Sequence, residues 1–96
     1  MKVYIAGSIS GDKGYFAKFE AYEQRYKDKG HIVLNPARLP GGLKVSEYMR
    51  ICFAMIEVAD RVMFLPDWEQ SGGARLEMEY CRYTGKPFQI IKNPEK

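Results

Sequence analysis

The sequence has few of the residues that stabilise small domains through disulfides or metal ions. Its 96 residues include two cysteines, Cys52 and Cys81, and one histidine. Two cysteines without a CxxC spacing are too few for a disulfide framework, so we interpret them as reduced thiols of a cytoplasmic protein. A single histidine gives no support to a metal site, and we expect none.

The chain also lacks a hydrophobic run approaching the roughly 20 residues of a membrane helix, and its first residues do not resemble a secretory signal. Its 15 Lys and Arg against 12 Asp and Glu give a net charge of +3. These charges are interspersed, which excludes the clustered basic footprint of a protein that binds nucleic acid polymers. The excess is compatible with a small phosphate-bearing ligand.

Residues 1–96 are predicted to form one domain in which strands and helices alternate. Short apolar runs bounded by Gly or Pro predict strands, and apolar residues at helical spacing predict helices. In the first helix Tyr15, Phe19, Tyr22 and Tyr26 recur at that spacing, and Gly30 ends it. The expected strands are residues 2–6, 31–34, 61–65 and 87–91, and the second and third helices are residues 46–59 and a segment that follows Gly73. The fold class is α/β, a small Rossmann-like or flavodoxin-like three-layer α/β/α domain with a four-stranded parallel sheet.

The helix predicted over residues 46–59 is apolar around most of its circumference. Arg50 and Glu57 mark its only clear polar line. A helix of this kind has a second surface to cover, and in so small a chain that surface is expected to belong to another copy. We therefore expect a homodimer or a higher homo-oligomer formed through this helix.

Three loops are expected at the carboxyl ends of the strands, where open α/β sheets bind ligands. They cover residues 7–11, 35–43 and 66–73. The first and third are rich in Gly and Ser and each precedes a helix, so their N–H groups can bind a phosphate or a carboxylate. Ser8, Ser10 and Ser71 add hydroxyl groups. The alternative is that these residues serve only as tight turns.

Two common nucleotide motifs are absent. GSISG is not GxGxxG, and Asn35 stands where a dinucleotide site would have an acid for the ribose. The sequence also has no GxxxxGK[ST] motif, which excludes a phosphate-loop NTPase. We expect no cofactor.

Glu77 is the residue whose predicted direction is unusual. With about 100° per residue, Arg75, Glu79 and Arg82 share the solvated face of the third helix, whereas Glu77 lies nearly opposite. A carboxylate on a core-facing side must be paired, hydrogen-bonded or exposed to a cavity. It is then either a nucleophile or general base, or a structural acid that pairs with Arg50 or Arg61 or reaches solvent.

Three segments in order resemble the nucleoside 2-deoxyribosyltransferase superfamily. They are Tyr4-Ile5-Ala6-Gly7-Ser8-Ile9 with Gly11, then Ala59-Asp60, then Ser71, Gly73 and Glu77 followed by Gly85-Lys86. The resemblance covers most of the chain and is strongest to small, often phage-borne proteins of this kind, with kinship to the 2'-deoxynucleoside 5'-phosphate N-hydrolases. It implies a Rossmann-like fold, oligomers with sites near subunit boundaries, and cleavage of an N-glycosidic bond.

The resemblance also implies roles for individual residues. Glu77 matches the glutamate that attacks the anomeric carbon, as in a retaining glycosidase, and Tyr4 matches the tyrosine that positions it. Ser71 matches a serine that grips a 5'-phosphate, where transferases acting on free nucleosides carry an acid. The candidate substrate-binding residues are Gly7, Ser8, Ser10, Gly11, Asn35, Asp67, Trp68, Ser71 and Gly73.

One position departs from the superfamily pattern. An aspartate that aids proton transfer to the base is usual in the second helix, and the corresponding residue here is Cys52. Asp67 is a possible substitute, and Trp68 beside it either stacks on a base or packs in the fold. Two functions follow: an enzyme acting on a nucleoside monophosphate or related ribosyl nucleotide, favoured by Glu77 and Tyr4, or a nucleotide-binding module without turnover, favoured by Cys52.

Overall fold

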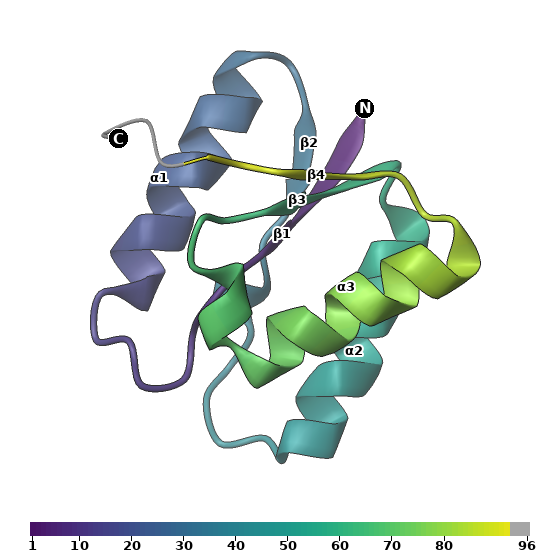
Figure 1. The fold of residues 1–96 in the computed structure, drawn as a ribbon. Helices are drawn as coiled ribbons and strands as arrows, with labels where there is room; N and C mark the ends of the chain where they lie inside the picture. Colours follow the sequence, from purple (N-terminus) through teal and green to yellow (C-terminus); the bar gives the residue numbers. More distant parts are fainter. Residues whose placement is uncertain (93–96) are drawn as a thin grey trace.

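A computed structural model describes residues 1–92 (Figure 1). The strands are β1 (Lys2–Ala6), β2 (Ile32–Leu34), β3 (Arg61–Phe64) and β4 (Phe88–Ile90), and the α-helices are α1 (Tyr15–Asp28), α2 (Val45–Val58) and α3 (Gly72–Thr84). Two short 3-10 helices, η1 (Pro36–Arg38) and η2 (Trp68–Gln70), lie in the loops after β2 and β3. Within these residues, no helix has the length and apolar character needed to span a membrane.

The four strands form one parallel sheet in the order β2-β1-β3-β4. In the register, Tyr4 of β1 lies between Leu34 of β2 and Val62 of β3. This is the order of the first strands in flavodoxin-like folds. The predicted α/β class and the four-stranded parallel sheet are confirmed.

Alternation along the strands divides the core into two layers, one on each face of the sheet. Tyr4 and Ala6 pack with α2 and α3, in a cluster that includes Cys52, Ile56 and Met78. The alternate residues of β1 face α1, where Ile5 contacts the cluster of Phe19 and Val3 contacts that of Tyr26. Figure 1 shows the same arrangement, with α1 on one side of the sheet and α2 and α3 on the other.

The element bounds differ from the predicted ones by one or two residues at several ends, and both 3-10 helices were missed. η1 forms because the Asn35 side chain accepts a hydrogen bond from the N–H of Ala37 and because Pro36 suits the first helical position. Such a single turn leaves no periodic pattern in the sequence.

The loop after β2 is attached to α1 by a buried carboxylate. Glu23 Oε1 accepts hydrogen bonds from Asn35 Nδ2 and Arg38 Nε, both at 2.8 Å. Burial alone would raise the pKa of Glu23, but the hydrogen bonds from Lys27, Asn35 and Arg38 lower it to about 2. Glu23 is therefore ionised at neutral pH and holds the start of this loop against α1.

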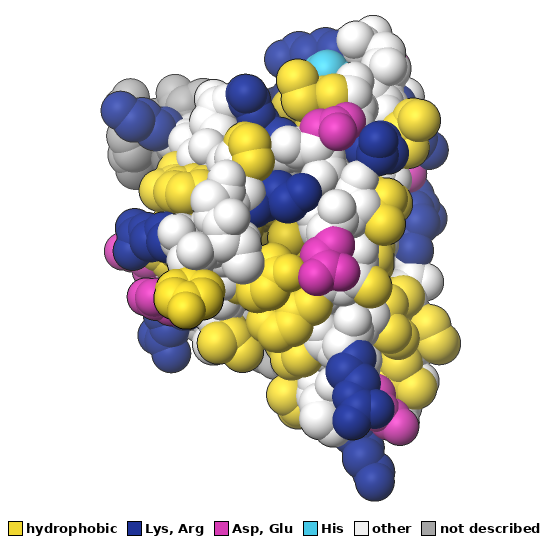
Figure 2. All heavy atoms as spheres, turned by 90° about the vertical axis from the view of Figure 1, so that its right-hand side faces the viewer, with side chains coloured by type: hydrophobic (Ala, Val, Ile, Leu, Met, Phe, Trp, Pro, Cys, Tyr) yellow, Lys and Arg dark blue, Asp and Glu magenta, His cyan; other side chains and the backbone are white. Residues whose placement is uncertain are grey.

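Several apolar side chains on α2 and α3 lie in solvent. Val45 is 78% exposed and Val58 is 55% exposed, and Ile51, Leu76 and Tyr83 are also exposed. Figure 2 faces this side of the molecule and shows hydrophobic side chains gathered in the lower half of the view, with few charged side chains among them. α2 is thus buried on one side only, through Cys52 and Ile56.

Candidate active site

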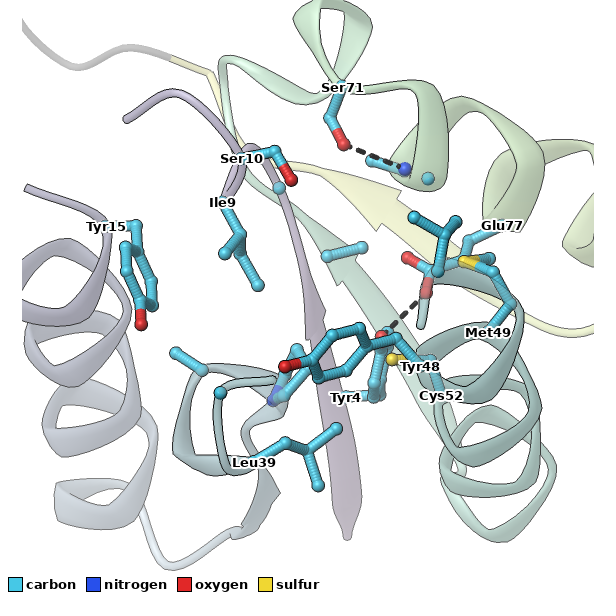
Figure 3. Close-up of a pocket in the computed structure, with 18 residues that line it drawn as sticks. Tyr4, Ile9, Ser10, Tyr15, Leu39, Tyr48, Met49, Cys52, Ser71 and Glu77 are labelled. Atoms are coloured by element: carbon cyan, nitrogen blue, oxygen red, sulfur yellow. Dashed lines mark hydrogen bonds between the residues drawn. The ribbon is translucent and has the colours of Figure 1, made fainter. Parts of the chain in front are cut away.

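A cavity of about 290 Å³ opens at the carboxyl end of the sheet (Figure 3). The loop after β1 leads to α1 on one face and the loop after β3 leads to α3 on the other, so the two loops diverge and leave space between them. The lining comes from these loops, the loop after β2, and the inner sides of α2 and α3. Its residues are Tyr4, Ala6, Gly7, Ile9, Ser10, Tyr15, Pro36, Ala37, Leu39, Gly41, Val45, Tyr48, Met49, Cys52, Ser71, Gly73, Ala74 and Glu77.

Glu77 lies in the wall of this cavity and is 5% exposed. Its Oε2 accepts a hydrogen bond from the hydroxyl of Tyr4 at 2.7 Å, and Tyr4 is 1% exposed on the central strand β1 (Figure 3). Among residues 1–92, Glu77 makes no ion pair with Arg50 or Arg61. The carboxylate is therefore neither paired nor in bulk solvent, and it borders a cavity.

Burial controls the protonation of Glu77. Loss of solvent raises its pKa from 4.5 to about 7, although the hydrogen bond from Tyr4 acts in the opposite direction. The pKa of Tyr4 is raised well above 10.0, first by its own burial and then by the neighbouring carboxylate. Near neutral pH, Glu77 thus exchanges between a carboxylate and a carboxylic acid while Tyr4 keeps its proton.

Cys52 is the third buried group at this point of the cavity. It lies on α2, lines the cavity with Tyr4 and Glu77, and is a free thiol. Burial raises its pKa, and the Glu77 carboxylate acts in the same direction. Cys52 is accordingly a neutral thiol rather than a thiolate nucleophile.

Ser71 caps the N-terminus of α3 at another side of the cavity. Its Oγ accepts a hydrogen bond from the N–H of Ala74 at 3.1 Å, which leaves the hydroxyl proton available to a ligand. The N–H groups of Gly72 and Gly73 begin the helix and have no partner within residues 1–92. Figure 3 shows Ser10, from the loop after β1, on the same side of the cavity as Ser71.

Gly7 is required where β1 ends. A Cβ at this position would lie 2.8 Å from a methyl carbon of Leu65, closer than carbon atoms approach. The absence of a side chain lets the backbone of Gly7 pass close to Leu65 at the end of β3, where Gly7 lines the cavity. Gly73 has more room, since its nearest neighbour, the sulfur of Met49, would be 3.6 Å away.

Two of the predicted substrate-binding residues belong to a charge cluster beside the cavity. Asp67 accepts a hydrogen bond from the N–H of Ser8 at 3.2 Å and pairs with Lys18. Lys18 also donates to the carbonyl of Ser8 at 2.9 Å and to Asp12 at 2.6 Å. Neither Ser8 nor Asp67 lines the cavity, so the structure gives no support to Ser8 as a ligand or to Asp67 as a substitute for the missing acid of α2.

Three further predicted residues also lie outside the lining. Asn35 uses its amide for the contacts with Glu23 and Ala37. Trp68 packs edge-on against Phe64, with ring centroids 5.7 Å apart. Gly11 is an exposed turn residue with φ +79°. Of the predicted residues, Tyr4, Gly7, Ser10, Ser71, Gly73 and Glu77 do line the cavity.

The sequence interpretation missed the wall formed by α2. Val45, Tyr48, Met49 and Cys52 follow one another at helical spacing and all face the cavity. This signal was present, but it was assigned to a subunit interface because the whole helix is apolar. The Tyr48 hydroxyl also donates to the carbonyl of Pro40 at 2.6 Å and so attaches the loop after β2 to α2.

No metal-binding group is present in the part of the chain that the structure describes: no three His, Cys, Asp or Glu side chains lie close enough together to hold an ion.

Comparisons with known proteins agree on the fold. A family model described as Domain of unknown function (DUF4406) matches residues 1–90. A solved structure of 2-deoxyribosyltransferase from the psychrotolerant bacterium Bacillus psychrosaccharolyticus superposes with a TM-score of 0.76 at 18% identity, over 96% of this chain and 72% of that one. No curated protein matches the sequence. The resemblance to the deoxyribosyltransferase superfamily is thus confirmed at the level of the fold.

The burial of Glu77 predicts a stability that depends on pH. The folded-state pKa of about 7 exceeds the ordinary value of 4.5 for a glutamate, so between these pH values the folded protein binds more protons than the unfolded chain. The free energy of unfolding therefore decreases as the pH rises from about 4.5 through 7. Glu77→Gln keeps an acceptor for Tyr4 and does not titrate. Its free energy of unfolding, relative to that of the wild type, should therefore be roughly 2 kcal/mol greater at pH 8 than at pH 5.

Urea denaturation at the two pH values measures this difference. Glu79→Gln, an exposed change two residues further along α3, serves as the control and should leave the pH dependence unchanged. Equal pH dependence in the wild type and Glu77→Gln would contradict the burial of an ionisable Glu77.

Proposed function

We propose that this chain, which belongs to the family described as Domain of unknown function (DUF4406), cleaves or transfers the N-glycosidic bond of a (deoxy)nucleoside 5'-monophosphate or related ribosyl nucleotide. The observation that carries the proposal is the buried Glu77, which Tyr4 holds by a hydrogen bond in the wall of a cavity. The fold shared with a 2-deoxyribosyltransferase supports the same class of chemistry.

In the proposed reaction Glu77 is the nucleophile. Its ionised carboxylate attacks the anomeric carbon of the sugar, the carbon–nitrogen bond breaks, and the electron pair of that bond stays with the base. Water, or a second base, then displaces the carboxylate from the glycosyl ester. Because Tyr4 donates to Oε2, that bond orients the carboxylate and leaves Oε1 for the attack.

The 5'-phosphate is assigned to the side of the cavity formed by Ser10 and Ser71. The first turn of α3 offers the N–H groups of Gly72 and Gly73 there, together with the positive end of the helix dipole. No cationic side chain of the described residues lines this side, so the phosphate would be held by neutral donors.

The second candidate function is a binding module with the same cavity. Cys52 favours it, because a buried neutral thiol stands where an enzyme of this class would gain from an acid. Such a module would bind the nucleotide and release no base.

We also propose that two or more copies assemble through α2. Ile51, Ala54 and Val58 form an exposed apolar line on the side of this helix away from the sheet. Val45, at the start of the helix, is both exposed and part of the cavity lining, so a copy packed on α2 would lie next to the cavity mouth.

Base release tests the enzyme against the binding module. Purified wild type incubated with deoxynucleoside 5'-monophosphates should release free base, detected by chromatography, with a rate that rises as the pH increases through about 7 because Glu77 must be ionised. Glu77→Gln should lose activity by about 1,000-fold or more. Tyr4→Phe should lose less activity. Its pH profile should move to higher pH, because the hydrogen bond from Tyr4 lowers the pKa of Glu77 and its removal raises that pKa.

The opposite results separate the candidates. If neither the wild type nor Glu77→Gln releases base but both bind the nucleotide, the binding module is correct. Equal activity of the two proteins would exclude Glu77 as the nucleophile.

Calorimetry on Ser71 variants tests the phosphate site. Ser71→Ala should weaken binding of the 5'-monophosphate by about 3- to 10-fold, the effect of one hydrogen bond, and should leave the nucleoside unaffected. Ser71→Asp retains the cap of α3 and adds a negative charge, so it should weaken binding of the 5'-monophosphate more than Ser71→Ala does. Equal losses for nucleotide and nucleoside would show that Ser71 only stabilises the helix.

Sedimentation equilibrium tests the assembly. The wild type should be a dimer or larger, and Val58→Glu should shift it towards monomer because it places a charge in the apolar line. Ala21→Glu, at an exposed position of α1, is the matched control and should have no effect. A monomeric wild type at the concentrations used for assays would contradict the proposal.

A further inference from the structure

The cavity carries an unusual balance of charge. Among residues 1–92, Glu77 is the only Asp or Glu in the lining, and no Lys, Arg or His of this range lines the cavity. Lys18 of α1, whose ammonium group contacts the loop after β1, is already held between Asp12 and Asp67. The interior is therefore negative when Glu77 is ionised, although the whole chain has a net charge of +3.

The lining also provides no second acid. A neutral purine or pyrimidine leaves with the electron pair of the glycosidic bond and must receive a proton, a task for which enzymes use a carboxylic acid or a histidine. Glu77 is the only such group in the lining, and it cannot attack the sugar as a carboxylate and donate a proton in the same step. The remaining proton donors are hydroxyl groups and the Cys52 thiol, which are far weaker acids.

Apolar and aromatic side chains form most of the remaining wall. Ile9, Leu39 and Met49 surround the space, and the rings of Tyr15 and Tyr48 border it on different sides (Figure 3). Tyrosine rings attract cations, whereas the aliphatic side chains offer no hydrogen bonds to the edge of a base. This wall suits a flat ring that carries positive charge.

We propose that the substrates are nucleotides whose leaving ring is already cationic, such as a pyridinium or an N7-alkylated purine. The inference rests on the proposed function and names the substrate class of the same site. When Glu77 attacks the anomeric carbon, the electron pair of the breaking bond neutralises the ring, which leaves without a proton. Water then cleaves the glycosyl ester, restores the carboxylate and releases one proton to the solvent.

A matched pair of substrates isolates the ring charge. Guanosine 5'-monophosphate and 7-methylguanosine 5'-monophosphate differ by one methyl group and one positive charge, and nicotinamide mononucleotide adds a pyridinium ring. Release of base is measured with the wild type and Glu77→Gln at pH 7.5, and the spontaneous rate is subtracted. The two cationic substrates should react about 100-fold faster or more than guanosine 5'-monophosphate, because general acid catalysis contributes about that much for a neutral base.

The outcomes distinguish this inference from the proposed function. Equal rates for the neutral and the methylated substrate would overturn the inference and leave glycosidic cleavage standing. No release from any substrate would overturn both.

Cys52 variants give a second readout. Cys52→Asp places an acid beside Glu77 and Tyr4 and should increase the rate for guanosine 5'-monophosphate at least about 10-fold, with no gain for the cationic substrates. Cys52→Asn has the same shape without the proton and should produce no such gain. A gain with Cys52→Asn, or equal gains for neutral and cationic substrates, would show that proton supply does not limit the reaction. Thermal unfolding of both variants confirms that they are folded.

Discussion

The hydrogen bond between Tyr4 and Glu77 is the interaction on which the site depends. A carboxylate that is 5% exposed loses most of its hydration, and burial without a partner would be costly. One hydrogen bond from a phenol that is itself buried compensates only in part, as the pKa of about 7 shows. Glu77 is thus less hydrated than a surface carboxylate, at a cost in stability above neutral pH. The large core cluster around Tyr4, with Phe64, Ile56 and Met78, holds Tyr4 in position for this hydrogen bond.

The cavity is shaped by loops, and α1 holds two of them in place. Lys18 connects the backbone of Ser8 with Asp67 and so joins the loop after β1 to the loop after β3. One turn and a half further along, Glu23 holds Asn35 and Arg38 of the loop after β2. α1 contributes only Tyr15 to the lining, yet its polar side chains fix the positions of Gly7, Ser10 and Pro36 through their loops. A rigid helix therefore positions a site that it hardly contacts.

Local patterns were sufficient to predict the fold and the centre of the site. Alternation and helical spacing act within a few residues, so the strands, the three helices and the inward direction of Glu77 could be predicted from the sequence. Asp67 and Trp68 show the limit of such patterns. Their positions follow from the pairing of Asp67 with Lys18, 49 residues away, and from the packing of Trp68 on Phe64. Tyr48 was missed for a different reason. Helix α2 is apolar around most of its circumference, so its sequence does not show which side lines the cavity and which side lies in solvent.

Overall charge is a poor guide to the ligand of this protein. The excess of basic residues suggested a phosphate, but the structure places these residues at the surface or pairs them, as it does for Lys18, Lys27 and Arg38. A ligand inside the cavity meets one carboxylate, several hydroxyl groups and the N-terminus of α3 instead. Because electrostatic interactions strengthen where water is excluded, these few groups outweigh the distant surface charges. The chemistry of the lining, rather than the net charge of the chain, therefore determines which groups a ligand in this cavity contacts.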